Sequence, residues 1–123
     1  PSLGFDGLLS PAAATKEFVA LLERLSPFGS GNAEPRFAFA DARIVFSDIV
    51  GADHVRCTIT DAQGNGRVKG IAFRSVDTPL GRALLDRGGI ALHLAGHLRV
   101  DRWQGRESVQ LFIEDAAPAC PAG

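Results

Sequence analysis

Between residues 37 and 113, apolar and polar side chains alternate in short runs that turn-forming residues separate. A period of two is typical of β-strands that bury one face and expose the other. This pattern constrains the fold more than composition does, because a strand period cannot be accommodated on a helix. The predicted strands cover residues 37–50, 54–60, 67–74, 90–100 and 107–114. The apolar residues Phe37, Phe39, Ile44, Phe46 and Val50 indicate that the first strand is long and has room for a bulge.

Turn signals order these strands along the chain. The Asn-Gly pair at 65–66 favours a tight hairpin between the second and third strands. The Thr-Pro pair at 78–79 begins a short helix, and Gly88 is predicted to end it in the left-handed conformation. Gly96, inside the fourth strand, marks a place where the strand bends or another group approaches closely.

An amphipathic helix is predicted over residues 11–25, ahead of the strands. Ser10 offers a side-chain acceptor to the first amides, and Pro11 is favoured at the first helical position. The apolar residues at helical spacing are Ala14, Phe18, Leu21, Leu22 and Leu25. This stripe needs a partner, which is either the domain that follows or one that precedes the helix.

The helix is followed by "SPFGSGNAEPRF", residues 26–37, which contains two glycines, one asparagine and two prolines. Pro27 ends the helix, and Pro35 favours extended backbone at the residue before it. The segment is not a dinucleotide loop, because it lacks G-x-G-x-x-G and follows a helix, although its backbone could form a nest for one phosphate. We expect a hinge over residues 27–36.

Three strands, a short helix and two further strands predict a mainly β fold. The order suits a five-stranded, partly open barrel of the OB type, with the helix covering one end and the amphipathic helix preceding it. A β-sandwich would need about seven strands. With 123 residues, 46% of them hydrophobic, the chain can form one core but not a second full domain.

Composition argues against a membrane or exported protein. No run approaches the roughly 18 apolar residues of a membrane span, and no signal peptide is visible. Cys57 lies in an alternating run and Cys120 in an Ala/Pro/Gly tail, so we expect no disulfide and a reducing, cytoplasmic setting. Because the chain begins with Pro1 and contains no methionine, we expect a piece of a longer protein.

The candidate catalytic groups do not form a site in the sequence. His93 and His97 are four residues apart, but on a strand this spacing separates their rings by about 13 Å, so we expect solvated strand histidines. The acidic residues Asp101, Glu107, Glu114 and Asp115 have no evident base or metal beside them. We predict no catalytic residue and no metal or other cofactor in this chain.

A binding surface has better support. Residues 51–113 carry nine basic and six acidic side chains, although the whole chain has a net charge of −1. OB-type domains bind oligonucleotides on the face of strands two and three and on two neighbouring loops. Trp103, the only tryptophan, can stack on a base or fold down onto the rim of the barrel. The predicted nucleic-acid-binding residues are Arg56, Arg67, Lys69, Phe73, Arg99, Arg102, Trp103 and Arg106.

Several of these stretches share one resemblance. The run "PFGSGNAEP" at 27–35, followed in order by "HVR", "IAF", "DRWQG" and "VQLFIED", resembles the carboxy-terminal part of the RecJ family, bacterial exonucleases specific for single-stranded DNA. The likeness covers about residues 5–115. The chain departs from the family pattern at Ala33, Val55, Arg56 and Asp101, the last in place of an asparagine that has an amide to donate.

The resemblance implies a 5′ to 3′ exonuclease of recombination and repair, whose Mg²⁺ or Mn²⁺ is held by DHH-type motifs that this sequence does not contain. Its implied partners are single-stranded DNA, the absent nuclease core and other repair proteins, with no membrane. The expected organisation is a helix from the end of the core domain (1–26), a hinge aligning the domain with the nuclease groove (27–36), an OB-fold domain (37–115) and a frayed tail (116–123).

Two other functions remain open at this stage. A protein-interaction module could use the same fold to dock the nuclease core or a repair protein, and the modest net charge favours it. An independent hydrolase would show metal-dependent cleavage by this chain alone, which we do not expect.

Overall fold

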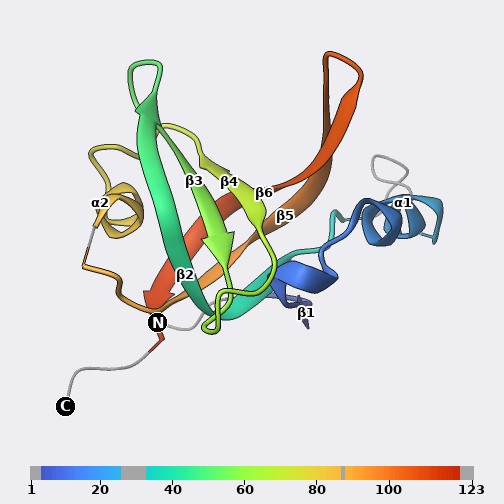
Figure 1. The fold of residues 1–123 in the computed structure, drawn as a ribbon, viewed down its shortest axis with the longest axis horizontal. Coiled ribbons are helices and arrows are strands. Elements are labelled where there is room, and N and C mark those ends of the chain that lie inside the picture. Colours follow the sequence, from blue (N-terminus) through green and yellow to red (C-terminus); the bar gives the residue numbers. More distant parts are fainter. Residues whose placement is uncertain (1–3, 26–32, 87, 120–123) are drawn as a thin grey trace.

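The computed structural model describes residues 4–25, 33–86 and 88–119. Within them five of the strands form one ring, with α1 and α2 on opposite sides of it (Figure 1). The elements in chain order are β1 (Gly7–Leu8), η1 (Pro11–Ala13), α1 (Lys16–Leu25), β2 (Phe37–Val50), β3 (His54–Thr60), β4 (Val68–Ala72), α2 (Pro79–Leu85), β5 (Leu92–Trp103) and β6 (Arg106–Pro118).

The ring is closed by hydrogen bonding. Its strand order is β2-β3-β4-β6-β5, and β5 pairs back with β2. β4 and β6 are parallel, whereas the other neighbours in the ring are antiparallel. A mainly β fold with five principal strands and a helix between the third and fourth is therefore confirmed.

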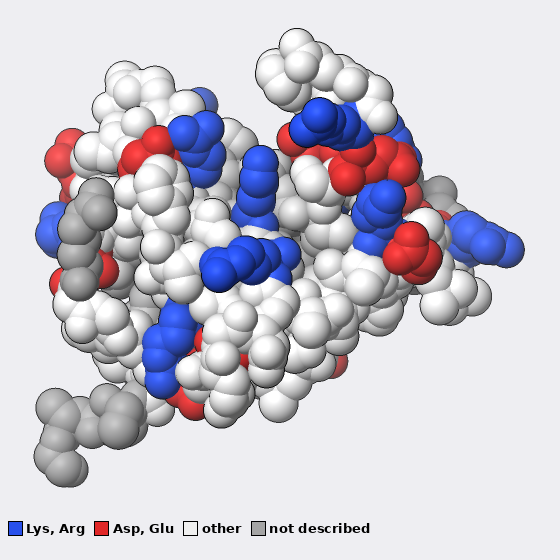
Figure 2. All heavy atoms as spheres, in the orientation of Figure 1, with Lys and Arg blue, Asp and Glu red and all other residues white. Residues whose placement is uncertain are grey.

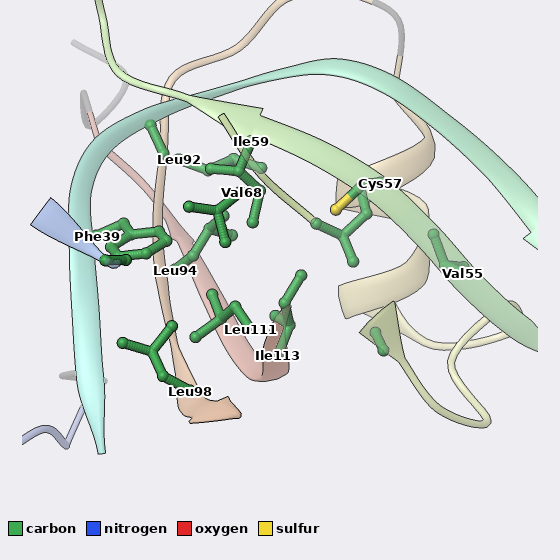
Figure 3. Packing of buried hydrophobic residues seen from close by; sticks show 14 of the residues in the cluster. Phe39, Val55, Cys57, Ile59, Val68, Leu92, Leu94, Leu98, Leu111 and Ile113 are labelled. Carbon is green, nitrogen blue, oxygen red and sulfur yellow. The ribbon is translucent and has the colours of Figure 1, made fainter. Parts of the chain in front are cut away.

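The core fills the inside of this ring. Alternate residues of the strands point inward, and Phe39, Ile59, Leu94 and Leu111 are fully buried together (Figure 3). α2 contributes Leu84 to the same cluster, which places the helix over part of the core. Cys57 is a small core residue, and burial raises the pKa of its thiol to about 12.

The first predicted helix is divided in two. Ser10 Oγ accepts from the Ala13 amide and caps the 3-10 helix η1, and Thr15 Oγ1 then accepts from the Phe18 amide at the start of α1. One side of α1 packs on the domain that follows: Val19 is buried, and the Phe18 ring meets Phe37 edge-on at 5.6 Å. The other side remains exposed.

Two predicted turns are formed differently. The β3–β4 connection is longer than a tight Asn-Gly hairpin, because Asp61 Oδ1 accepts from the amides of Gln63 and Asn65 and holds an open loop. α2 ends at Leu85, before Gly88, and the left-handed glycine is Gly89. The chain leaves the helix at the cap residue Asp86, whose backbone is extended.

The last two strands are longer than predicted. β5 begins at Leu92, so Ile90, which the predicted strand 90–100 included, lies outside it and is exposed. β6 pairs with β5 as far as Pro118, so the predicted tail at 116–123 begins too early, and Cys120 lies outside the described residues. Gly96 lies at a register shift beside the Phe112 carbonyl, which confirms its predicted close contact.

Residues 27–32 of the predicted hinge also lie outside the described residues. The described end of the hinge, residues 33–36, leads into β2. It is hydrogen-bonded to the residue before β1: the Arg36 amide donates to Asp6 Oδ2, and the Asp6 amide donates to the Arg36 carbonyl. In the parts of the chain that the structure describes, no helix combines the length and apolarity needed to cross a membrane.

Candidate nucleic-acid interface

Two hairpins frame a groove on the outside of the ring. The β2–β3 hairpin and the β5–β6 hairpin stand apart as two arms (Figure 1). Figure 2 shows the surface hollowed between them, with basic side chains in the hollow. The groove, of about 850 Å³, is lined by Arg56, Lys69, Asp101, Trp103, Gln104, Arg106, Glu107, Ser108 and Gln110. It thus joins the outer face of β3 and β4 to the β5–β6 arm.

The β5–β6 arm ends in a two-residue turn. Gln104 and Gly105 both have positive φ, 51° and 76°, which is the backbone that suits the twist of a tight hairpin. Trp103 and Arg106 face each other across the turn. Because Trp103 is 67% exposed, the alternative in which it folds down onto the rim is wrong.

Four of the eight predicted binding residues meet in the groove: Arg56, Lys69, Trp103 and Arg106. Arg102 lies on the same arm, where its Nε donates to Glu107 Oε2 at 2.7 Å. Arg67 is exposed in the β3–β4 connection and is not among the residues that line the groove.

The other two predicted residues, Phe73 and Arg99, belong to the adjoining outer face. The Phe73 ring packs edge-on against His54 at 5.2 Å and Phe112 at 5.7 Å. The Arg99 guanidinium lies 4.9 Å from the Phe112 ring centroid and donates to both carboxylate oxygens of Glu34, at 2.7 and 3.0 Å. Both side chains are therefore already engaged within the domain.

The cations of the groove differ in how much of their charge is compensated. Arg56 donates through Nε and Nη2 to the two oxygens of Asp48, at 3.0 and 2.6 Å. This hydrogen bond holds the pKa of the Asp48 carboxyl below its usual value and raises that of Arg56. Lys69 and Arg106 make no ion pair with any described residue.

Sequence reasoning missed three residues of this surface. Gln110 and Phe112 point outward by simple alternation with Leu111 and Ile113, so the strand pattern could have identified them. Phe46 was predicted to alternate with the core residues of its strand, but a β-bulge between Ile44 and Phe46 shifts the register and turns its ring outward. The apolar spacing allowed a bulge in this strand but did not show where it would lie.

The histidines are structural instead of solvated. His93 Nδ1 accepts the Asp41 amide at 3.0 Å, and His97 lies 2.9 Å from the Pro35 carbonyl and 3.1 Å from Glu114 Oε1. Both rings are half-buried, so the prediction of solvated strand histidines is wrong. Within residues 4–25, 33–86 and 88–119, no group of three or more His, Cys, Asp or Glu is placed to hold a metal ion.

A closed ring of five strands, with one helix between the third and the fourth and a groove lined by basic and acidic side chains beside the last hairpin, defines a small β-domain. Residues 5–115 match the family model described as RecJ OB domain. The chain belongs to this family.

Named relatives agree with the match. The chain is 34% identical over 113 residues to the single-stranded-DNA-specific exonuclease RecJ of Escherichia coli, covering 92% of this chain and 19% of that protein. It is 27% identical over 105 residues to the RecJ exonuclease of Bacillus subtilis, covering 84% of this chain and 13% of that protein. The chain therefore spans about a fifth or less of the length of these relatives.

Proposed function

We propose that this OB domain binds single-stranded DNA in the groove and serves a RecJ-type 5′ to 3′ exonuclease in recombination and repair. The exposed indole of Trp103 beside Lys69 and Arg106 carries the proposal. An aromatic face accepts any base, and cations without internal partners are available to phosphates. Catalysis and its divalent metal belong, in this proposal, to the remainder of the nuclease.

Affinity measurements test the proposal directly. We expect the domain alone to bind oligothymidylate weakly, with a Kd on the order of micromolar to millimolar, because only a few phosphates are engaged. Trp103→Ala should weaken binding about 5- to 100-fold at every salt concentration, since one stacked base is lost. Fluorescence anisotropy with a labelled oligonucleotide gives these values.

Salt dependence separates the cations from the indole. Lys69→Ala and Arg106→Ala should each flatten the log-log dependence of binding on salt by about 0.7, the contribution of one single-strand phosphate contact. Arg82→Ala, which removes an exposed arginine of α2 that does not line the groove, is the matched control and should change neither affinity nor slope. Binding that is unaltered by all the groove variants would contradict the assigned surface.

We propose a second candidate function, protein docking, on another surface. Leu8 of β1 and Leu21 and Leu25 of α1 are exposed apolar side chains. Exposed apolar side chains of this kind suit contact with protein, such as the nuclease core or a repair partner. Docking would replace the first proposal if the domain ignored single strands at low salt but bound the catalytic part of a RecJ protein in calorimetry.

A further inference from the structure

Phe46 is an exposed aromatic that the β-bulge of β2 places on the outer face. Ile44 is paired with Ile59 and Phe46 with Thr58, so one extra residue of β2 is inserted between these two pairs. The insertion reverses the side-chain alternation, and Phe46 is 52% exposed while Ser47 is buried. Bulges of this kind re-aim a side chain, often beside a binding site.

The Phe46 ring borders a small hollow that adjoins the groove. The hollow, of about 180 Å³, is lined by Phe46, Arg56, Cys57, Thr58 and Lys69. Arg56 and Lys69 also line the larger groove, so the two depressions share one cationic border. The hollow is smaller than the roughly 300 Å³ of ordinary ligand pockets, so it suits a flat ring laid on Phe46 better than an enclosed ligand.

The remaining aromatic rings of this outer face are already engaged. Phe73 packs against His54 and Phe112, and Phe112 also carries the Arg99 guanidinium. Among the described aromatic pairs and cation–π contacts, none involves Phe46 or Trp103. These two rings therefore lie on either side of the shared cations with a face open to a ligand.

We propose that the hollow beside Phe46 is a second nucleotide subsite, in which a base stacks on Phe46. The phosphates between this base and the one on Trp103 would contact Lys69 and the side of the Arg56 guanidinium that Asp48 does not occupy. A single strand would thus extend across β4 and β3 towards β2 instead of remaining at the hairpin tip. The inference rests on the proposed DNA-binding function and deepens it.

The single tryptophan makes the two subsites separately measurable. Quenching of Trp103 fluorescence reports the hairpin subsite alone, because the chain contains no other indole. We would titrate an oligothymidylate of about 3 nucleotides, which is shorter than the usual site of an OB fold, and one of about 12, which is within its range. Phe46→Ala should leave the titration of the short strand unchanged and weaken binding of the long strand about 5- to 100-fold.

Matched variants control for the fold. Val45→Ala truncates the neighbouring exposed apolar residue of the same bulge, which is 49% exposed and does not line the Phe46 hollow, so it should bind both strands as the parent does. Phe46→Tyr retains an aromatic face and should restore binding of the long strand. Equal long-strand affinity of Phe46→Ala and the parent overturns the subsite, and so does equal weakening of both strands. If the parent itself binds neither strand, the proposed function fails as well.

Discussion

At the scale of single residues, internal carboxylates limit how much positive charge the outer face presents. Arg56, Arg102 and Arg99 are held by Asp48, Glu107 and Glu34, respectively. The exposed pairs of Arg56 and Arg102 contribute little to stability, so their main effect is on what these two arginines can bind. The strand pattern predicted that Arg56 points outward, but it contains no sign of the carboxylate eight residues earlier that binds it.

Removing the carboxylate opposite Arg56 should therefore strengthen binding to DNA. We expect Asp48→Asn to lower the Kd for oligothymidylate about 2- to 5-fold and to steepen the salt dependence by up to about 0.7, because Arg56 becomes available to a phosphate. Asp101→Asn is the matched control: it removes a groove carboxylate that makes no ion pair with a described residue, and so measures net charge alone. Weaker binding by Asp48→Asn would mean that the carboxylate orients Arg56 for its ligand.

At the scale of elements, the sequence pattern predicted the strands, the possibility of a bulge in the first one and the irregularity at Gly96, but it did not locate the register shifts within β2. β2 and β3 have the predicted bounds, 37–50 and 54–60. Contacts with residues distant in sequence support the register shifts in β2. One of them is the hydrogen bond from the amide of Asp41, a residue with a φ of 56°, to His93 on β5. The two-residue β1 is too short to produce a pattern at all.

Gly96 is the irregularity with the clearest energetic consequence. A Cβ at this position would overlap the carbonyl group of Phe112 on β6, and that backbone cannot move away without breaking the β5–β6 pairing. Gly96→Ala should lower the free energy of unfolding by at least about 2 kcal/mol. Urea denaturation followed by circular dichroism measures this value. Gly4→Ala, where a Cβ meets nothing within 4 Å, should change it by less than about 0.5 kcal/mol.

At the scale of the whole molecule, the proposed binding face is joined to the segment that leads into the ring. Glu34 binds Arg99 on β5, the Pro35 carbonyl lies 2.9 Å from His97, and Arg36 pairs with Glu114 of β6. The number and order of the main strands were predictable from the sequence. These contacts were not, because the Glu34–Arg99 pair spans 65 residues and forms only when the ring closes.

The Glu34–Arg99 pair should make stability depend on acid pH. The hydrogen bond from Arg99 lowers the pKa of Glu34 from its ordinary 4.5, and the Glu34 side chain is only 18% exposed. A carboxyl whose pKa is lower in the folded state stabilises the fold above its unfolded pKa, and this contribution disappears as the pH falls through the folded value. The free energy of unfolding should therefore decrease as the pH is lowered from about 5 to about 3. In Glu34→Gln this decrease should be smaller, and the free energy of unfolding at pH 7 should be lower than in the parent. Urea denaturation across this pH range, with Glu17→Gln of α1 as an exposed control, tests the prediction; an unaltered pH profile in Glu34→Gln would contradict it.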